Sequence, residues 1–229
     1  MMKNNWDLSY KNGYNHNLYP NEELIRFLNT FIKKQVDIGQ FKNIYNNTTN
    51  PPPPPTSNIS TLNIRALDFG CGIGRQTLFL SEFDIESHGI DISKQAIDKA
   101  KKLSEQLNIK AIFEIYDGKN IKFRDNFFDF SISLGVLNCI PIANLPNILR
   151  EIKRVTKKYC FFTLIGDISH KIKYNIDNKN FNPIEFYFND ENIFEIFNEF
   201  QIININKNTK ESLINRDIYT TYSITLQKN

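Results

Sequence analysis

The sequence has little of what marks several large classes of protein. Its three cysteines, Cys71, Cys139 and Cys160, are an odd number without a C-x-x-C pair, so we expect neither a disulfide framework nor a zinc site. No apolar run approaches the roughly eighteen residues of a membrane span. Residues 1–6 lack the apolar core of a signal peptide. These absences predict a protein of the reducing cytoplasm with no membrane partner.

The excess of positive over negative charge is also small. The 28 basic and 25 acidic residues leave a net charge of +3, dispersed along the chain without a basic stripe, which argues against nucleic acid as a partner. Hydrophobic residues make up 41% and charged residues 23%, as in ordinary globular proteins. A length of 229 residues suits one domain with a small appendage.

The N-terminal part predicts a helical cap, over residues 1–45. Asn21 can cap a helix whose apolar positions, Leu24 to Val36, recur at helical spacing. Residues 46–60 are rich in Asn and contain five consecutive prolines, which cannot join a helix or a sheet interior. We interpret this stretch as a surface insertion, although docking of a proline-recognising module stays open. Residues 61–229 form the main domain.

From residue 63 onward, apolar strands alternate with amphipathic helices. Strands are expected at 64–69, 87–91, 111–116, 128–134, 159–165, 201–206 and 218–226, and helices at 76–80, 93–107, 145–155 and 190–197. Residues 167–188 are polar and aromatic and suit a loop or lid. Strands joined by helical crossovers predict an α/β fold with a mostly parallel sheet and helices on both faces.

A glycine-rich turn joins the first of these strands to its helix. Residues 68–75 read Asp-Phe-Gly-Cys-Gly-Ile-Gly-Arg, at the edge where open α/β sheets bind ligands. The spacing is G-x-G-x-G, and Arg75 stands where the dinucleotide pattern has its third glycine, which argues against NAD or FAD. A P-loop lysine is absent as well. The simpler alternative is a turn without a ligand.

Carboxylates recur at the tips of three successive strands. Asp68 precedes the glycines, where it favours a cationic ligand over a phosphate. Asp91 ends the second strand and can bind both hydroxyls of a ribose, unless it only caps the next helix, a role that Ser93 can fill. Asp117 with Gly118 can frame an adenine, and a plain Asp-Gly turn is the alternative.

These motifs resemble the class I S-adenosylmethionine-dependent methyltransferases of the small-molecule type. Residues 67–74, 89–93, 116–118 and 127–137 are similar to that family's first four motifs, and residues 145–155 to its helix before strand five. The resemblance covers residues 63–166 and implies a Rossmann-like α/β/α sandwich, with a seven-stranded sheet whose last strand is antiparallel. It implies S-adenosyl-L-methionine as cofactor and S-adenosyl-L-homocysteine as product. The positions it implies for cofactor binding are Asp68, Gly70, Cys71, Gly72, Gly74, Asp91, Ile92, Asp117, Gly118, Leu134 and Gly135.

Aromatic residues of the N-terminal segment are candidates for a lid over the cofactor. Trp6, Tyr10, Tyr14 and Tyr19 can offer ring faces to a sulfonium, each worth roughly 0.5–2 kcal/mol, or they merely pack the first helix on the sheet. Methyl transfer depends mainly on alignment of the two reactants, so no catalytic triad is expected. His16, Asp167 and His170 are the candidates for a base, with surface histidines as the alternative.

The acceptor is narrowed by elimination to an O or N atom of a small molecule. The Asn/Asp-Pro-Pro-aromatic turn of nucleic-acid amino-methyltransferases, the paired glutamates of protein-arginine enzymes and a metal site of clustered carboxylates are all missing. A methyltransferase-like protein that only binds or regulates, and a NAD-dependent oxidoreductase, are the alternatives. The oligomeric state is not written in the sequence.

Overall fold

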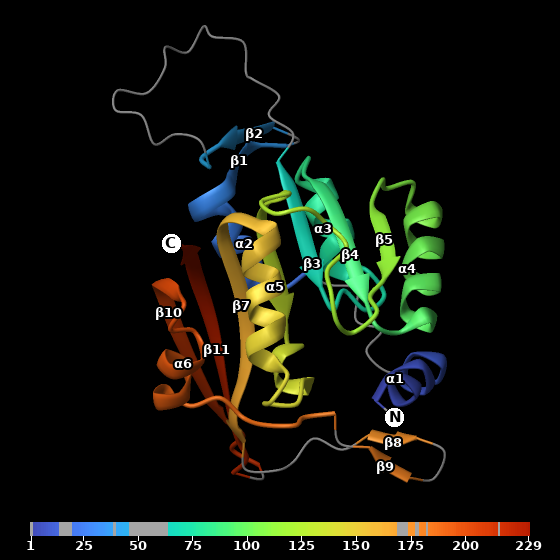
Figure 1. Cartoon of the computed structure of the whole chain (residues 1–229), viewed down its shortest axis with the longest axis vertical. Coiled ribbons are helices and arrows are strands. Elements are labelled where there is room, and N and C mark those ends of the chain that lie inside the picture. The colour runs from blue at the N-terminus through green and yellow to red at the C-terminus, as the bar shows by residue number, and fades with distance from the viewer. Residues whose placement is uncertain are drawn as a thin grey trace, which may run out of the picture.

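The computed structural model describes residues 2–13, 20–38, 40–45, 64–168, 174–176, 179–181, 183–214 and 216–229. A seven-stranded sheet in the order β10-β11-β7-β6-β3-β4-β5 forms the centre (Figure 1). Its strands are β3 (Arg65–Phe69), β4 (Glu86–Asp91), β5 (Ile112–Ile115), β6 (Phe128–Leu134), β7 (Thr156–Ile168), β10 (Phe200–Glu211) and β11 (Ile218–Lys228). β11 runs antiparallel to both of its neighbours, whereas β5, β4, β3, β6 and β7 are parallel. The predicted fold class is confirmed.

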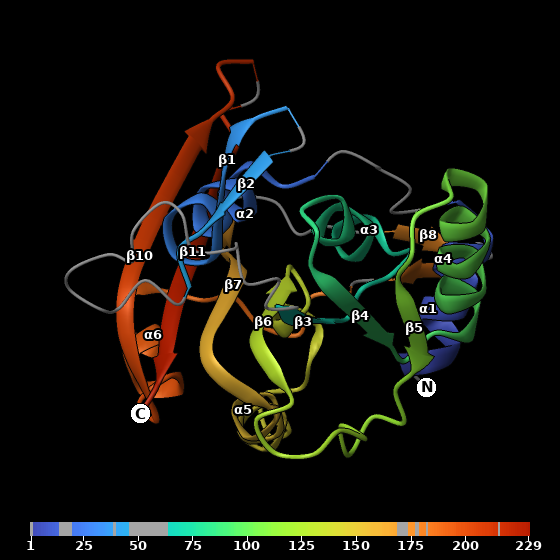
Figure 2. The same ribbon diagram turned by 90° about the horizontal axis from the view of Figure 1, so that it is seen from above.

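Helices cover both faces of this sheet. They are α3 (Arg75–Glu82), α4 (Lys94–Leu107), α5 (Leu145–Val155) and α6 (Asp190–Ile196), and Figure 2 shows α3 and α5 on opposite sides. Neighbouring strand residues therefore serve different cores, because successive side chains point to opposite faces. Phe162 packs with α5 and α6, and Phe161 packs with Phe27 of helix α2 (Glu22–Phe27), on the other face. Burial on both faces explains why these strands read as continuous apolar runs.

The N-terminal part differs from its prediction. Helix α2 (Glu22–Phe27) is capped by the Asn21 side chain, as predicted, and continues into a π-helical turn, Leu28–Ile32. The prediction that the helix runs on to Val36 is wrong, because the chain becomes strand β1 (Lys33–Asp37), paired with β2 (Gln40–Asn43). The buried Lys33 amino group lies 2.6 Å from a carboxylate oxygen of Asp84 and also donates to the Asp84 carbonyl, and these bonds hold the start of β1 on the end of α3.

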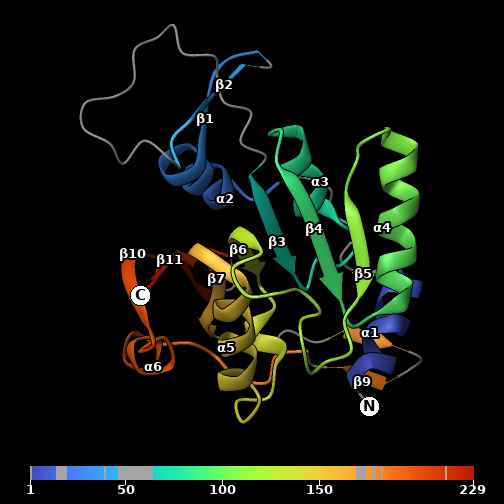
Figure 3. The same cartoon turned by 45° about the horizontal axis from the view of Figure 1, so that its top comes forward.

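The first described helix lies in the predicted helical cap, at residues to which the sequence analysis gave no helix bounds. α1 (Met2–Lys11) packs at the N-terminal end of α4 (Figures 1 and 3). The short hairpin of β8 (Tyr174–Ile176) and β9 (Lys179–Phe181) lies in the segment predicted as a loop or lid, and β8 contacts α1. The predicted Asn/Pro-rich insertion, residues 46–60, lies outside the described residues. Among the helices that are described, none is long and apolar enough to cross a membrane.

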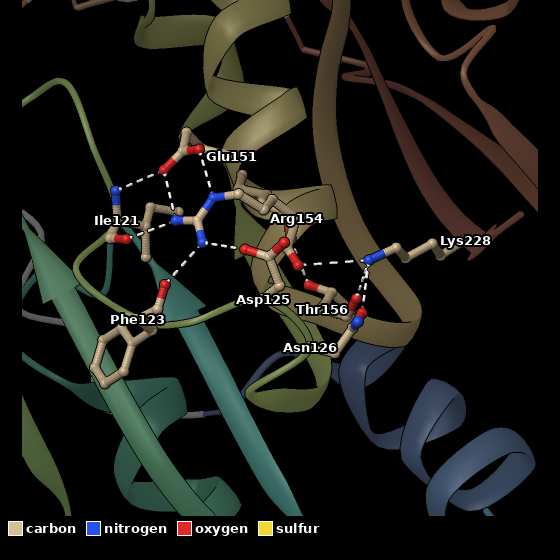
Figure 4. A network of polar contacts seen from close by, with 9 residues as sticks. Ile121, Phe123, Asp125, Asn126, Glu151, Arg154, Thr156 and Lys228 are labelled. Atoms are coloured by element: carbon tan, nitrogen blue, oxygen red, sulfur yellow. Dashed lines mark hydrogen bonds and ion pairs between the residues drawn. The ribbon is translucent and has the colours of Figure 1, made fainter.

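A polar network fixes the loop that joins β5 to β6 (Figure 4). The Arg154 guanidinium, at the end of α5, donates to the carbonyls of Ile121 and Phe123 and to the Asp125 carboxylate, each over 2.8 Å. Glu151 binds the same guanidinium and accepts a bond from the Ile121 N–H. The loop, which begins beside the carboxyl ends of β4 and β5, is thus held to helix α5.

Candidate active site

A cavity of about 540 Å³ opens at the carboxyl ends of β3, β4 and β6. Such a volume lies within the usual range for small-molecule sites. The glycine turn after β3 forms its floor, and backbone bonds fix this turn, since the N–H groups of Gly70 and Cys71 both donate to the Ile90 carbonyl of β4. The lining includes these sequence-predicted residues: Trp6, Asp68, Gly70, Cys71, Gly72, Asp91, Ile92, Gly118, Leu134 and Gly135.

Two predicted glycines have different surroundings. A Cβ on Gly72, whose φ is +56°, would lie 2.6 Å from the Tyr10 hydroxyl, so this position leaves room above the turn for a ring and a ligand. A Cβ on Gly74, with a φ of +87°, would meet Phe113 at 2.7 Å and Ala100 at 3.1 Å. Gly74 does not line the cavity in the described part of the chain. It allows α3 to begin close to β5 and α4.

The Asp68 carboxylate lies beneath the glycine turn and is only 2% exposed. It accepts a 2.7 Å hydrogen bond from the Thr77 hydroxyl. Burial and, to a smaller extent, the nearby Asp91 charge raise the pKa of Asp68 to about 7, against the lowering effects of Thr77 and the Arg75 guanidinium. A cation bound in the cavity would favour the charged form of this carboxylate.

The Asp91 carboxylate joins the glycine turn to the start of α4. One oxygen accepts from the Gly72 N–H at 2.9 Å, and the other from the Ser93 N–H at 2.8 Å. Burial raises the pKa of Asp91 to about 6 in spite of these bonds. Ser93 itself caps α4 through its hydroxyl, which accepts from the Ala96 N–H. Because the cap is supplied by Ser93, the lone pairs of Asp91 that remain can serve a ligand.

Asp117 belongs to the rim rather than to the cavity wall. Its side chain is exposed, and one carboxylate oxygen accepts from the N–H groups of Lys119 and Asn120 at 2.8 and 3.0 Å. These two bonds lower the pKa of Asp117. The geometry is that of the Asp-Gly turn considered above, and Gly118 and Tyr116 line the cavity in its place.

Two buried polar atoms of lining residues have no hydrogen-bond partner in the described structure. They are the side-chain nitrogen of Gln76 and the hydroxyl of Tyr116, both on residues of the lining. Buried polar groups are rarely left unpaired, because each costs about 1–3 kcal/mol. Their presence indicates a polar ligand. Sequence reasoning gave neither residue a role, since Gln76 lies outside the motifs and, in residues 116–118, only the acid and the glycine were considered.

Helix α1 covers the glycine turn. Trp6 and Tyr10, four residues apart on one face of the helix, both line the cavity, with ring centroids 6.0 Å apart. Burial and the Asp91 charge raise the pKa of Tyr10 well above its usual value, so its hydroxyl stays neutral. Tyr10 was predicted only as one of a group of lid aromatics. Tyr14, His16 and His170 lie outside the described residues, and Asp167 lies near the end of β7.

Asp7 attaches this helix to α4. Its carboxylate accepts from the Ser93 hydroxyl at 2.6 Å and from the Gln95 N–H at 3.2 Å, at the positive end of the α4 dipole. The Lys99 amino group donates to the Tyr10 carbonyl at the other end of α1. Asp7 and Lys99 together hold Trp6 and Tyr10 over the cavity.

We expect Asp7→Ala to loosen α1 from the cavity. Loss of a side-chain acceptor at a helix N-terminus costs about 1 kcal/mol, enough to expose the lid in a substantial fraction of molecules. Trp6 is the single tryptophan of the chain, so its fluorescence reports the change directly. Emission should shift to longer wavelength and become more accessible to iodide. Asp98→Ala, on the exposed side of α4, is the matched control, and equal spectra for the two variants would contradict this role of Asp7.

No group of three or more His, Cys, Asp or Glu side chains able to hold a metal ion occurs among the described residues. The three cysteines are buried and unbridged. Burial raises the pKa of Cys139, which lines the cavity, to about 12, so its thiol is uncharged near neutral pH. What the cavity offers is therefore a pair of buried carboxylates, a glycine-lined floor and an aromatic cover.

Comparison with known proteins gives the family context of this arrangement. A family model described as a methyltransferase domain matches residues 66–159. Sterol 4-C-methyltransferase strm-1 of Caenorhabditis elegans is 29% identical over 119 residues, 51% of this chain and 35% of that protein. The chain spans less than half the length of the curated relatives it matches.

Solved structures agree on the fold. A SAM-dependent methyltransferase from Methanosarcina mazei superposes with a TM-score of 0.60 at 20% identity, covering 72% of this chain and 92% of that one. Magnesium protoporphyrin IX methyltransferase from Synechocystis, solved with bound SAM, gives 0.54 at 14% identity, covering 74% and 72%.

Proposed function

This chain belongs to the class I, Rossmann-like S-adenosylmethionine-dependent methyltransferases, and from that premise we propose that it methylates a small molecule. The methyl group of S-adenosyl-L-methionine would pass to an O or N atom of the acceptor by in-line displacement, leaving S-adenosyl-L-homocysteine.

The observation that carries the proposal is the meeting of Asp68 and Asp91 in one cavity floored by glycines. Two buried carboxylates with raised pKa values are costly unless a cation joins them. S-adenosyl-L-methionine has a sulfonium and an ammonium, and its ribose offers two hydroxyl donors. We assign the ribose to Asp91, and the methionine part to Asp68, Gly70 and Gly72.

The remaining polar groups fit the same ligand. The unpaired nitrogen of Gln76 can donate to the methionine carboxylate, and the unpaired Tyr116 hydroxyl lies where an adenine would reach, next to Gly118. The backbone of Leu134 and Gly135 can accept from the ammonium. Trp6 and Tyr10 would exclude water from the sulfonium and add cation–π attraction. Gly74 and Asp117, outside the lining, would act through the shape of the turn and of the rim.

The cofactor supplies an activated methyl group and a good leaving group, so the protein chiefly aligns the reactants. Alignment is worth on the order of 7–11 kcal/mol, which exceeds the contribution of a single acid or base. The residues assigned above act as binding and positioning groups. His16, Asp167 and His170 stay candidates for a base.

Calorimetry with three nucleosides tests the proposal. We expect S-adenosyl-L-methionine and S-adenosyl-L-homocysteine to bind with micromolar affinity, and NAD to show no heat above dilution. The two buried carboxylates attract a cation only while they are ionised, and they become protonated as pH falls from 8 to 5.5. S-adenosyl-L-methionine, which has the sulfonium, should therefore lose more affinity over this range than S-adenosyl-L-homocysteine. Absence of binding by both sulfur nucleosides would remove the assignment.

A further inference from the structure

One part of the cavity is lined by residues whose chemistry differs from that of the cofactor residues. Its walls come from the 3-10 turn Leu137–Cys139 and the residues after it, from α5, from the end of β7 and from residues 183–184. The side chains that form it are Cys139, Ile140, Ile148, Ile165, Pro183 and Ile184. We call it the apolar compartment. Apart from the uncharged thiol, these side chains are hydrocarbon, and Asn144, at the start of α5, adds one uncharged amide to the lining.

The charged side chains of the lining belong to segments other than these walls, and, besides burial, the charge that acts on the Cys139 thiol is the negative one of Glu185, which raises the pKa of that thiol. Asp68, Arg75 and Asp91 are the charged side chains of the lining among the described residues, and all three belong to the glycine turn or the tip of β4. A phosphate or carboxylate placed in the apolar compartment would lose its hydration without gaining a cation from these walls. Such a transfer costs several kcal/mol.

A buried side-chain amide fixes the positions of these walls relative to one another. Asn138 is fully buried, and its side chain accepts from the Ile165 N–H at 2.8 Å while donating to the carbonyls of Ile165 and Phe186 at 2.7 and 2.9 Å. Its own carbonyl accepts from the N–H of Glu185. Asn138 thus joins the 3-10 turn, β7 and the 183–188 segment. A satisfied buried polar network of this kind specifies one arrangement, so the compartment is preformed.

We propose that the methyl acceptor is a small, predominantly apolar molecule with one nucleophilic heteroatom, held in the apolar compartment. The inference rests on the proposed function, because the compartment adjoins the cofactor residues. The acceptor's lone pair forms the bond to the methyl carbon while the carbon–sulfur bond breaks and its electron pair returns to sulfur. Any proton on the acceptor atom leaves to water, and an acceptor that is already deprotonated ends neutral.

Matched aromatic probes test the chemical class of the acceptor. Protein saturated with S-adenosyl-L-homocysteine is titrated with 2-naphthol and 2-naphthylamine, and with the 6-sulfonate of each. We expect each neutral probe to bind at least tenfold more tightly than its sulfonate, because the sulfonate must be desolvated. With S-adenosyl-L-methionine present, at least one neutral probe should yield its methyl derivative.

Wall substitutions locate the binding site. Ile165→Thr keeps a β-branched side chain and adds a hydroxyl to the wall, and should weaken the neutral probes about tenfold with the homocysteine nucleoside still bound. Ile205→Thr, on the distant edge strand β10, should leave both affinities unchanged. If the sulfonates bind as tightly as the neutral probes or more tightly, or if the nucleoside binds and no probe does, the inference about the acceptor is overturned and the proposed function is not. Failure of the nucleoside to bind overturns the proposed function.

Discussion

Asp91→Ala should lower the affinity for S-adenosyl-L-homocysteine at least a hundredfold. The substitution removes the acceptor for the proposed ribose hydroxyls and leaves the N–H groups of Gly72 and Ser93 without their 2.9 and 2.8 Å partners. Hydrogen bonds to a charged group contribute about 1.5–3 kcal/mol each, and every 1.4 kcal/mol is tenfold in affinity. Two lost ribose bonds therefore account for the expected change, which titration calorimetry measures.

Two further variants separate binding from folding. Asp91→Asn keeps one acceptor oxygen but turns an amide N–H toward the N–H of Gly72 or Ser93, so it should also bind weakly. Removal of a buried charge offsets the cost of this contact, and the melting temperature should stay near that of the wild type. Asp98→Ala removes an exposed carboxylate of α4, whose partner is Lys94, and should bind normally. An Asp91→Ala protein that melts cooperatively and binds within threefold of the wild type would contradict the ribose assignment.

The sequence was most informative where local patterns and tertiary structure agree. β6 and α5 have the predicted bounds, 128–134 and 145–155, because a continuous apolar run and a strong helical periodicity each allow one solution. The convergence of Asp68 and Asp91 also followed from local order, since the carboxyl ends of parallel strands meet at one edge.

Predictions failed where distant contacts decide the outcome. Apolar spacing predicts a helix up to Val36, but the helix ends at Ile32 because Lys33 binds Asp84, 51 positions away. Helix α1 is polar and short, and its docking depends on Asp7 meeting Ser93, 86 positions away. No local signal contains either contact. The position of the Asp117 side chain, by contrast, depends on local contacts, since its carboxylate accepts hydrogen bonds from the N–H groups of Lys119 and Asn120.

The apolar compartment was missed for a related reason. Its walls are contributed by the turn after β6, by α5, by the end of β7 and by residues 183–184, and each segment contributes only one or two side chains. In the sequence these are ordinary core residues. Asn138, which joins three of the segments, is indistinguishable there from the many other asparagines of the chain.

Asp68→Asn should bind the cofactor poorly and yet fold more stably without it. In the ligand-free protein, burial raises the pKa of Asp68 from the ordinary 3.8 to about 7. The folded state therefore holds a proton that the unfolded state releases, and the free energy of unfolding falls as pH rises from about 4 to 7. At 1.36 kcal/mol for each pKa unit, the upper bound of this loss at pH 8 is about 4 kcal/mol.

An asparagine avoids this loss because it is neutral, and its oxygen can still accept from the Thr77 hydroxyl. At pH 8 the ligand-free variant should melt several degrees above the wild type, since 1 kcal/mol corresponds to about 2–4 °C in a chain of this size. At pH 5, where the wild-type Asp68 is protonated in the folded state, most of the difference should vanish. Scanning calorimetry at the two pH values measures it, with Asp98→Asn as the exposed control.

Affinity for S-adenosyl-L-methionine should move in the opposite direction, because the variant has no charge to balance the bound cation. We expect a loss of at least thirtyfold at pH 8 and a smaller loss at pH 5.5, where protonation has already weakened the wild type. Local misfolding would lower stability and affinity together, so the opposed signs identify a charge that folding disfavours and the ligand requires. A variant less stable than the wild type at pH 8, or equally good at binding the sulfonium, would refute this account of Asp68.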